Sequence, residues 1–319
     1  MTNNSAVSKS VYRPGLNLSP YVLEGQDPNL QSQITKTHLR ELIRTIQPYT
    51  DWVRFFGMSN GLENGCEVAH DFGLKAAVGI WLDRDHDRNE NQISTALNIS
   101  KIYKPEMVIV GSETLFRKDL TEHQLLQYID QVRESFPSGT IITTADSHHI
   151  LIEHPKVLDS VDVIMANIYP YFSGEDIEKA ILILNIQYEQ LIGLAKGNQV
   201  IISETGWPSF GEKRNHAIAS PENAALYFLQ FASWAQEKKV THFYFEAFDE
   251  PWKARYEGLQ GSHFGLWDKN KVLKPGMQEV FEGKRVENIL EISSIAYHQK
   301  KAIENLPWFL KTVAQKFAK

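Results

Sequence analysis

Two glutamates of the sequence stand directly after apolar runs. Glu113 follows the run Met107–Val110 by three residues, and Glu204 follows Val200–Ile202 by two. If both runs are strands of one closed parallel sheet, both carboxyl groups lie at the same end of it and can face each other. A pair of carboxyl groups flanking a bond is what glycoside cleavage requires. Either glutamate alone would more often be a rim charge or a helix cap, but the pair in this register favours catalysis.

Eight short runs rich in β-branched and aromatic residues recur along the chain. Some are apolar almost throughout, as in Lys75–Leu82, which is typical of strands buried on both faces of a parallel sheet. Segments with helical periodicity lie between them, for example Leu39–Ile46, Leu125–Val132 and Ala180–Leu191. The predicted strands are Arg13–Leu18, Trp52–Phe56, Leu74–Leu82, Met107–Val110, Thr140–Thr144, Val161–Ile168, Gln199–Ser203 and Thr241–Ala247.

The spacing of these strands predicts a (β/α)8 TIM barrel. Consecutive strands start 21 to 42 residues apart, which leaves room for a crossover helix each time. An open, doubly wound sheet is the alternative, but the glycine-rich phosphate-binding turn expected after its first strand is missing. In a barrel, Glu113 and Glu204 stand at the ends of strands four and seven, at the mouth where barrel enzymes carry their active sites.

Length and composition bound the other possibilities. The chain has 319 residues, 42% of them hydrophobic and 23% charged, which is a globular composition. We expect a flexible N-terminus over residues 1–11, a barrel over 12–275 and a C-terminal helical extension over 276–319. The net charge of −6 argues against nucleic acid as a partner. A single cysteine, Cys66, excludes an internal disulfide.

Apolar residues recur at helical spacing near the C-terminus. The pattern predicts an amphipathic helix docked on the barrel, with a membrane surface or a partner protein as the alternative contact. No run of the sequence is long and apolar enough to predict a membrane span, and the N-terminus lacks the apolar stretch of a signal peptide. The chain as written is therefore expected in the cytoplasm, or outside it if an export signal has been removed. The pattern consists of Leu306, Phe309, Leu310, Val313 and Phe317.

Around both glutamates the sequence resembles glycoside hydrolase family 17, whose members act on β-1,3-glucans. Ile201–Ser209 resembles the nucleophile signature of that family, and Val108–Arg117 resembles the signature of its acid/base. Asn167–Phe172 and Phe245–Lys253 match the family after strands six and eight. Ser59–Asn64 looks like bacterial members of the family. The resemblance covers the predicted barrel.

The resemblance implies a retaining hydrolase of β-1,3-glucan, such as laminarin or its oligosaccharides, that needs neither a cofactor nor a metal ion. Glu204 is then the nucleophile and Glu113 the acid/base, so Glu204 must be ionised and Glu113 protonated in the free enzyme. Tyr169 is the family-matched residue that would hold Glu204. Glu250 and Lys253 match an acid and a base that line the sugar site, with a structural ion pair as the alternative.

Two tryptophans follow these site residues closely. Trp207 stands three residues after Glu204, and Trp252 lies between Glu250 and Lys253. An indole exposed at the mouth can lie against the apolar face of a sugar ring. We therefore expect both tryptophans to bind substrate, although a tryptophan taken alone is more often part of a core.

Ser112 departs from the family pattern, which usually has asparagine directly before the acid/base. The resemblance gives that amide a contact with the 2-hydroxyl of the sugar, and the serine hydroxyl is shorter. We expect slower turnover, a substrate that differs near this hydroxyl, or compensation by His148 or His149, which follow strand five.

Two other functions remain open. The same glutamates would serve a β-1,3-glucan transglycosylase, in which a sugar hydroxyl replaces water as the acceptor. A non-catalytic glucan-binding protein is conceivable because of Ser112, but the presence of both carboxyl groups disfavours it.

Overall fold

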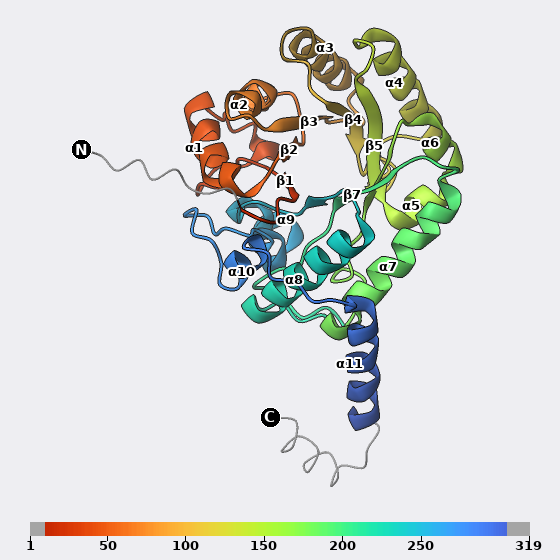
Figure 1. Cartoon of the computed structure of the whole chain (residues 1–319). Helices are drawn as coiled ribbons and strands as arrows, with labels where there is room; N and C mark the ends of the chain where they lie inside the picture. Colours follow the sequence, from red (N-terminus) through yellow and green to blue (C-terminus); the bar gives the residue numbers. More distant parts are fainter. Residues whose placement is uncertain (1–9, 305–319) are drawn as a thin grey trace, which may run out of the picture.

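Eight parallel strands form the centre of the protein (Figure 1). The computed structural model describes residues 10–304, and each predicted strand overlaps one in the structure. The strands are β1 (Gly15–Asn17), β2 (Trp52–Phe55), β3 (Lys75–Ile80), β4 (Met107–Ser112), β5 (Ile141–Ser147), β6 (Ile164–Asn167), β7 (Val200–Glu204) and β8 (Phe243–Tyr244).

The sheet closes on itself. Its strand order is β7-β6-β5-β4-β3-β2-β1-β8, and a parallel bridge between Ile202 and His242 joins β7 to the residue before β8. An open doubly wound sheet would have two free edges, so the predicted (β/α)8 TIM barrel is confirmed and the alternative is excluded.

Helices alternate with the strands and cover the outside of the barrel (Figure 1). The helices are α1 (Lys36–Ile46), α2 (Gly65–Asp71), α3 (His86–Tyr103), α4 (Glu122–Ser135), α5 (His148–Glu153), α6 (Pro155–Ser160), α7 (Ile177–Leu194), α8 (Pro221–Lys238), α9 (Ala254–Glu257), α10 (Met277–Phe281) and α11 (Ile289–Glu304). Short 3₁₀ helices are η1 (Pro28–Leu30), η2 (Gln47–Tyr49), η3 (Leu62–Asn64), η4 (Pro251–Lys253) and η5 (Leu259–His263).

Alternating side chains of each strand divide the core into two parts. On β4, Val108 and Val110 join the large cluster between strands and helices, whereas Met107 and Ile109 join a small cluster with Met165 and Phe243. Because side chains alternate along a strand, the second cluster fills the interior of the barrel. Both faces of β4 are thus buried, which explains its uninterrupted apolar sequence.

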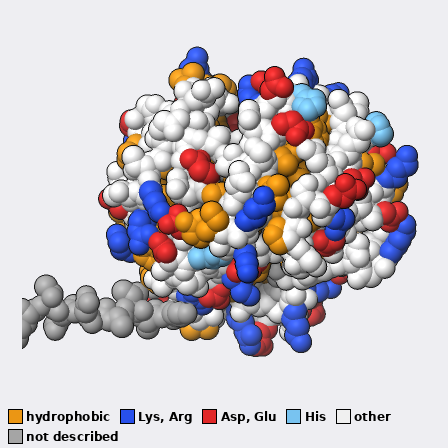
Figure 2. Space-filling view, turned by 90° about the horizontal axis from the view of Figure 1, so that it is seen from above, with side chains coloured by type: hydrophobic (Ala, Val, Ile, Leu, Met, Phe, Trp, Pro, Cys, Tyr) orange, Lys and Arg blue, Asp and Glu red, His pale blue; other side chains and the backbone are white. Residues whose placement is uncertain are grey.

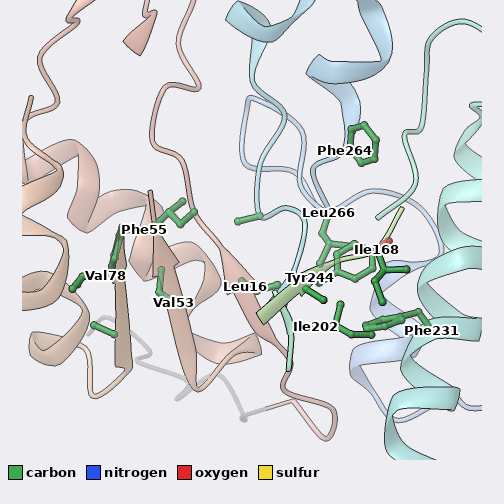
Figure 3. Close-up of a cluster of buried hydrophobic side chains, with 14 of the residues drawn as sticks. Leu16, Val53, Phe55, Val78, Ile168, Ile202, Phe231, Tyr244, Phe264 and Leu266 are labelled. Atoms are coloured by element: carbon green, nitrogen blue, oxygen red, sulfur yellow. The ribbon is translucent and has the colours of Figure 1, made fainter. Parts of the chain in front are cut away.

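The larger cluster lies between the strands and their covering helices. Figure 3 shows part of it, with Leu16, Val53 and Ile202 contributed by the strands and Phe231 by α8. Burying these side chains contributes roughly 1.5–3 kcal/mol each. This layer holds the strands in place, and the carboxyl ends of these strands carry the candidate site.

The helix α4 begins at a well-defined cap. Thr121 accepts a hydrogen bond from the backbone of Gln124, and the Gln124 side chain accepts one from the backbone of Thr121. This capping box stops the helix from extending backward, so the segment between β4 and α4 that holds Glu113 remains a loop.

The C-terminal segment 276–304 adds two helices to the barrel. The helix α10 contacts α8, and α11 packs against α7 and α8 (Figure 1). Lys300 of α11 forms ion pairs with Asp176 and Glu178 at the start of α7. The predicted flexible segment falls mostly on residues 1–9, which lie outside the described part of the chain, as do the residues of the predicted amphipathic pattern.

Charges of both signs are interspersed on the face shown in Figure 2, with hydrophobic side chains between them. Among the described residues, no helix has the length and apolarity needed to cross a membrane.

Candidate active site

An extra residue interrupts the sheet directly before each glutamate. On β4 the pairing with β5 moves from Ile109 to Ser112 while β5 advances by only two residues. On β7 the pairing with β6 skips Ser203, so that Glu204 stands opposite Asn167. Such β-bulges change the direction of the side chains that follow. In a regular strand, each of the two carboxyl groups would point to the opposite face of the sheet.

Glu204 is held by two donors, one from β2 and one from the loop after β6. Arg54 Nη1 lies 2.7 Å from Oε1 of Glu204, and the Tyr169 hydroxyl donates to Oε2 at 3.0 Å. Arg54 is 1% and Glu204 6% exposed. Burial, followed by the charges of Glu204 and Glu113, raises the pKa of Tyr169 well above its usual value. The phenol therefore keeps its proton and donates a hydrogen bond to the carboxyl group of Glu204.

Glu113 occupies different surroundings. Its backbone has a left-handed conformation, with φ 55°, and its amide donates to the Ala145 carbonyl at 2.7 Å. Asn167 Nδ2 donates to Oε1 at 2.8 Å, and the Ser147 hydroxyl donates to the same oxygen at 3.2 Å. These are uncharged donors, so Glu113 has no direct cationic partner among residues 10–304.

The pKa of Glu113 rises to about 7, first because of burial and second because of the charge on Glu204. Asp146 adds to the increase, while the hydrogen bonds from Asn167 and Ser147 oppose it. The two carboxyl groups of the site therefore differ in what they can do. Glu204 has an arginine partner that stabilises a carboxylate, as a nucleophile needs, whereas the raised pKa of Glu113 suits a proton donor.

The loop that follows Glu113 is fixed by a buried carboxylate. Asp146 Oδ2 accepts from the backbone amides of Leu115 and Phe116 at 3.1 and 3.4 Å. Arg117 donates to the carbonyls of Ser112 and Leu82. The acid/base candidate thus stands on a loop that is bonded on both sides.

Ser112 lies within the same network. Arg54 Nη2 donates to its hydroxyl at 3.0 Å, and Ser112 is 8% exposed. The two histidines considered as compensation have other contacts: His148 bonds Gln190 of α7 at 2.9 Å, and the ring of His149 lies against Phe116. The structure gives no support to either imidazole replacing the usual asparagine.

Glu250 and Lys253 are part of a buried cluster that also includes Glu246. Lys253 Nζ lies 2.7 and 2.8 Å from the two carboxyl oxygens of Glu246 and 2.9 Å from Glu250 Oε1. Glu246 is 1%, Glu250 0% and Lys253 5% exposed. The structural ion pair is therefore present. Direct lining of a sugar site by these side chains is disfavoured by their burial.

The two carboxyl groups of this cluster have opposite pKa shifts. Burial, then the charge of Glu250, raises the pKa of Glu246 well above its usual value. Burial acts in the same direction on Glu250, but Lys253 and the hydrogen bonds to Glu250 outweigh it and lower its pKa. The carboxyl oxygen Oε2 of Glu250 also accepts from Ser19, at 2.6 Å, and from the indole of Trp252. Of the two carboxyl groups, Glu246 therefore takes up a proton more readily than Glu250.

The two candidate tryptophans differ in exposure. Trp207 is 1% exposed, donates to the Ile218 carbonyl at 2.9 Å and packs against Tyr171 and Tyr227. The expectation that its face binds a sugar is wrong, because α8 and the loop after β7 cover the indole. Trp252 is partly exposed, and the ring of Tyr256, 48% exposed, lies 5.9 Å from it.

Sequence reasoning missed Arg54 and Glu246 and gave Asn167 no role of its own. Arg54 interrupts the apolar strand Trp52–Phe55, and Glu246 directly follows the aromatic run Phe243–Phe245. A charged residue within or directly after a buried strand was the available signal, since such residues are almost never buried without a partner.

No group of three or more His, Cys, Asp or Glu side chains in residues 10–304 is arranged to hold a metal ion.

Comparison with known proteins identifies the family. The model of the BtgE/BtgC glycoside hydrolase domain matches residues 15–265. The chain is also 32% identical to the glycoside hydrolase family 17 β-1,3-glucanosyltransferase of Rhizomucor miehei, with a TM-score of 0.73, over 83% of this chain and 96% of that one. The chain belongs to glycoside hydrolase family 17. A solved structure of an active-site mutant of the Rhizomucor enzyme contains laminaritriose.

Curated relatives of this family 17 chain come from fungi. It is 27% identical to the glucan endo-1,3-beta-glucosidase btgC of Emericella nidulans over 83% of this chain and 45% of that protein. It is 28% identical to a glucan 1,3-beta-glucosidase of Saccharomyces cerevisiae over 73% of this chain and 82% of the yeast protein. The chain thus spans less than half of the Emericella relative. These fungal relatives give no support to the expectation of a bacterial-type member.

Proposed function

We propose that the protein cleaves β-1,3-glucosidic bonds of β-1,3-glucan or its oligosaccharides with retention of configuration at the anomeric carbon. The observation that carries this proposal is the contrast between two carboxyl groups at the barrel mouth: Glu204 is buried and paired with Arg54, whereas the partly exposed Glu113 has a pKa raised to about 7. Glycosidases with a nucleophile and a separate acid/base need this division of protonation states. The relatives that act on β-1,3-glucan support the choice of substrate.

In the first step Glu204 attacks the anomeric carbon, and Glu113 transfers its proton to the departing glycosidic oxygen. The bond from Glu204 to the sugar replaces the bond to the leaving group. Arg54 and Tyr169 hold the attacking carboxylate in one orientation, which reduces the entropy that must be lost at the transition state. The charge on Glu204 disappears as the glycosyl-enzyme forms.

In the second step Glu113, now ionised, takes a proton from water, whose oxygen attacks the anomeric carbon and releases Glu204. The same step with a sugar hydroxyl in place of water is transglycosylation. The similarity to the Rhizomucor glucanosyltransferase supports transglycosylation as the alternative function. Ser112 and Trp252 are the proposed substrate contacts. Tyr169 holds Glu204, and Glu250, paired with Lys253, holds the indole of Trp252.

The test uses a laminari-oligosaccharide of defined length with the parent chain, E204Q and E113Q. We expect the parent to produce shorter sugars whose new reducing ends are initially β, as read by proton NMR, and E204Q to lose more than about 1,000-fold of turnover. Products longer than the starting sugar would establish transfer. Equal turnover by E204Q and the parent would exclude Glu204 as the nucleophile, and a parent that binds the oligosaccharide without turning it over would leave glucan binding as the explanation.

A further inference from the structure

Asn167 connects the neighbourhoods of the two glutamates. It is the last residue of β6 and is 3% exposed. Its Nδ2 lies 2.8 Å from Glu113 Oε1, and its Oδ1 accepts a hydrogen bond from the Ser203 hydroxyl at 2.6 Å. Ser203 directly precedes Glu204 and is 0% exposed.

The bond from Ser203 fixes which end of the Asn167 amide faces Glu113. A hydroxyl can donate to an amide oxygen or accept from an amide nitrogen, and in this structure the Ser203 hydroxyl donates to Oδ1 of Asn167. With Oδ1 bound to Ser203, Nδ2 must point the other way, toward Glu113. Since Ser203 and Asn167 are both buried, water does not compete for these positions.

Both donors that reach the Glu113 carboxyl group bind one oxygen. Asn167 and Ser147 donate to Oε1, and among residues 10–304 no donor contacts Oε2. A proton on Oε1 would point at groups that are themselves donors, so the acidic proton belongs on Oε2. Oε2 is also the oxygen left free to meet a substrate.

We propose that Asn167, oriented by Ser203, is a positioning residue that directs the acidic proton of Glu113 to Oε2 and holds the carboxyl group in the orientation for proton transfer. This inference rests on the proposed function of Glu113 as general acid. Asn167 acts through Glu113 rather than through contact with the reacting atoms.

The same hydrogen bond acts on the second step. A donor to a carboxyl group favours its ionised form, and the bond from Asn167 accordingly lowers the pKa of Glu113 against the effect of burial. Removing the Asn167 side chain is therefore expected to raise the pKa of Glu113 and to let its carboxyl group rotate.

The test compares two substrates with the variant N167A. The first is a laminari-oligosaccharide, whose leaving group needs protonation, and the second is a laminaribiosyl fluoride, whose leaving group needs none. We expect N167A to lose at least about 10-fold in kcat/KM on the oligosaccharide, part of the 10²–10⁴-fold that a general acid contributes. The fluoride should react to form the glycosyl-enzyme within about 3-fold of the parent rate. The basic limb of the oligosaccharide pH profile should move to higher pH.

S203A provides a second variant if N167A does not fold. It keeps the Asn167 amide but removes the group that orients it, so the same selective loss should appear at smaller size. N185A is the matched control, because Asn185 accepts a hydrogen bond from Trp234 outside the site, and it should affect both substrates alike and leave the pH profile in place.

Equal losses on both substrates with an unchanged basic limb, in N167A and S203A, would overturn the positioning role. That result differs from failure of the proposed function, which would appear in the parent background as unchanged oligosaccharide turnover by E113Q and E204Q.

Discussion

Arg54 on β2 and Glu204 at the end of β7 form a buried ion pair, with 2.7 Å between Nη1 and Oε1. Arg54 also donates to Asn17 Oδ1 at 2.9 Å and to Ser112 Oγ at 3.0 Å. Burying two charges costs desolvation free energy that their attraction barely offsets. The pair is therefore better explained by what it does for Glu204, whose carboxyl group it holds in one place, than by a gain in stability.

Replacing Arg54 by methionine leaves the Glu204 charge buried without its cation. We expect the free energy of unfolding of R54M to be about 3–5 kcal/mol lower than that of the parent. Its glucan turnover should fall by more than about 100-fold. Urea denaturation and oligosaccharide kinetics measure the two effects. R40M, which breaks the exposed pair with Asp71, is the control and should cost less than about 1 kcal/mol. Similar behaviour of both variants would refute a special role for Arg54.

The pKa of Glu113, raised to about 7 by burial and by Glu204, predicts the basic limb of activity. The acid must be protonated to protonate the leaving oxygen, so kcat/KM for an oligosaccharide should fall about tenfold per pH unit above this pKa. A pH profile of initial rates tests this expectation. With the laminaribiosyl fluoride, the step that forms the glycosyl-enzyme should not show this limb, and a limb of equal size there would assign it to another group.

The same shift predicts a pH-dependent gain in stability for E113Q. In the folded protein the pKa of Glu113 is about 7. In the unfolded chain it is the ordinary pKa of glutamate, about 4.3. The stability due to the protonated form is thus present at pH 4 and lost as the pH rises through 7. E113Q should match the parent at pH 4 and exceed it at pH 8 by up to about 3 kcal/mol. The exposed Glu134 of α4 supplies the control E134Q, for which no such difference is expected.

Glu246 and Glu250 should respond differently to the same substitution. The pKa of Glu246 is raised and that of Glu250 is lowered beside Lys253, so glutamine resembles a protonated Glu246 more closely than it resembles an ionised Glu250. E246Q should change the free energy of unfolding by less than about 1 kcal/mol, and E250Q should lower it by about 3–5 kcal/mol. Equal destabilisation in urea at pH 7 would show that the proton is not held by Glu246.

Trp207 and Trp252 form a second matched pair. W207A removes a buried indole, which should cost about 3–5 kcal/mol of stability. W252A removes a partly exposed indole, so its main effect should be a higher KM for glucan oligosaccharides, by about 10-fold. Thermal unfolding and steady-state kinetics separate the two. A W252A variant with unchanged KM and reduced stability would make Trp252 a packing residue as well.

Local patterns were sufficient to place the strands and the two glutamates. The apolar runs of β4 and β7 need only burial on both faces to be recognised, and the barrel puts whatever follows them at its mouth. Tyr169 could be placed beside Glu204 through the family resemblance, and the structure has a hydrogen bond between them. The strands and the glutamates depend on sequence positions within one strand and its following loop, whereas the contact between Tyr169 and Glu204 joins two strand ends and could be expected only from the resemblance.

What joins different strands was decided by the tertiary structure. Arg54 and Glu204 are 150 residues apart in sequence, and their pairing exists only because the sheet closes. The bulges before Glu113 and Glu204 depend on how β4 and β7 pair with their neighbours. Trp207 is buried because a helix 14 or more residues later covers it, which no pattern around Trp207 records. Sequence periodicity reports which face of an element is buried, but the partner on that face is chosen by packing across the whole barrel.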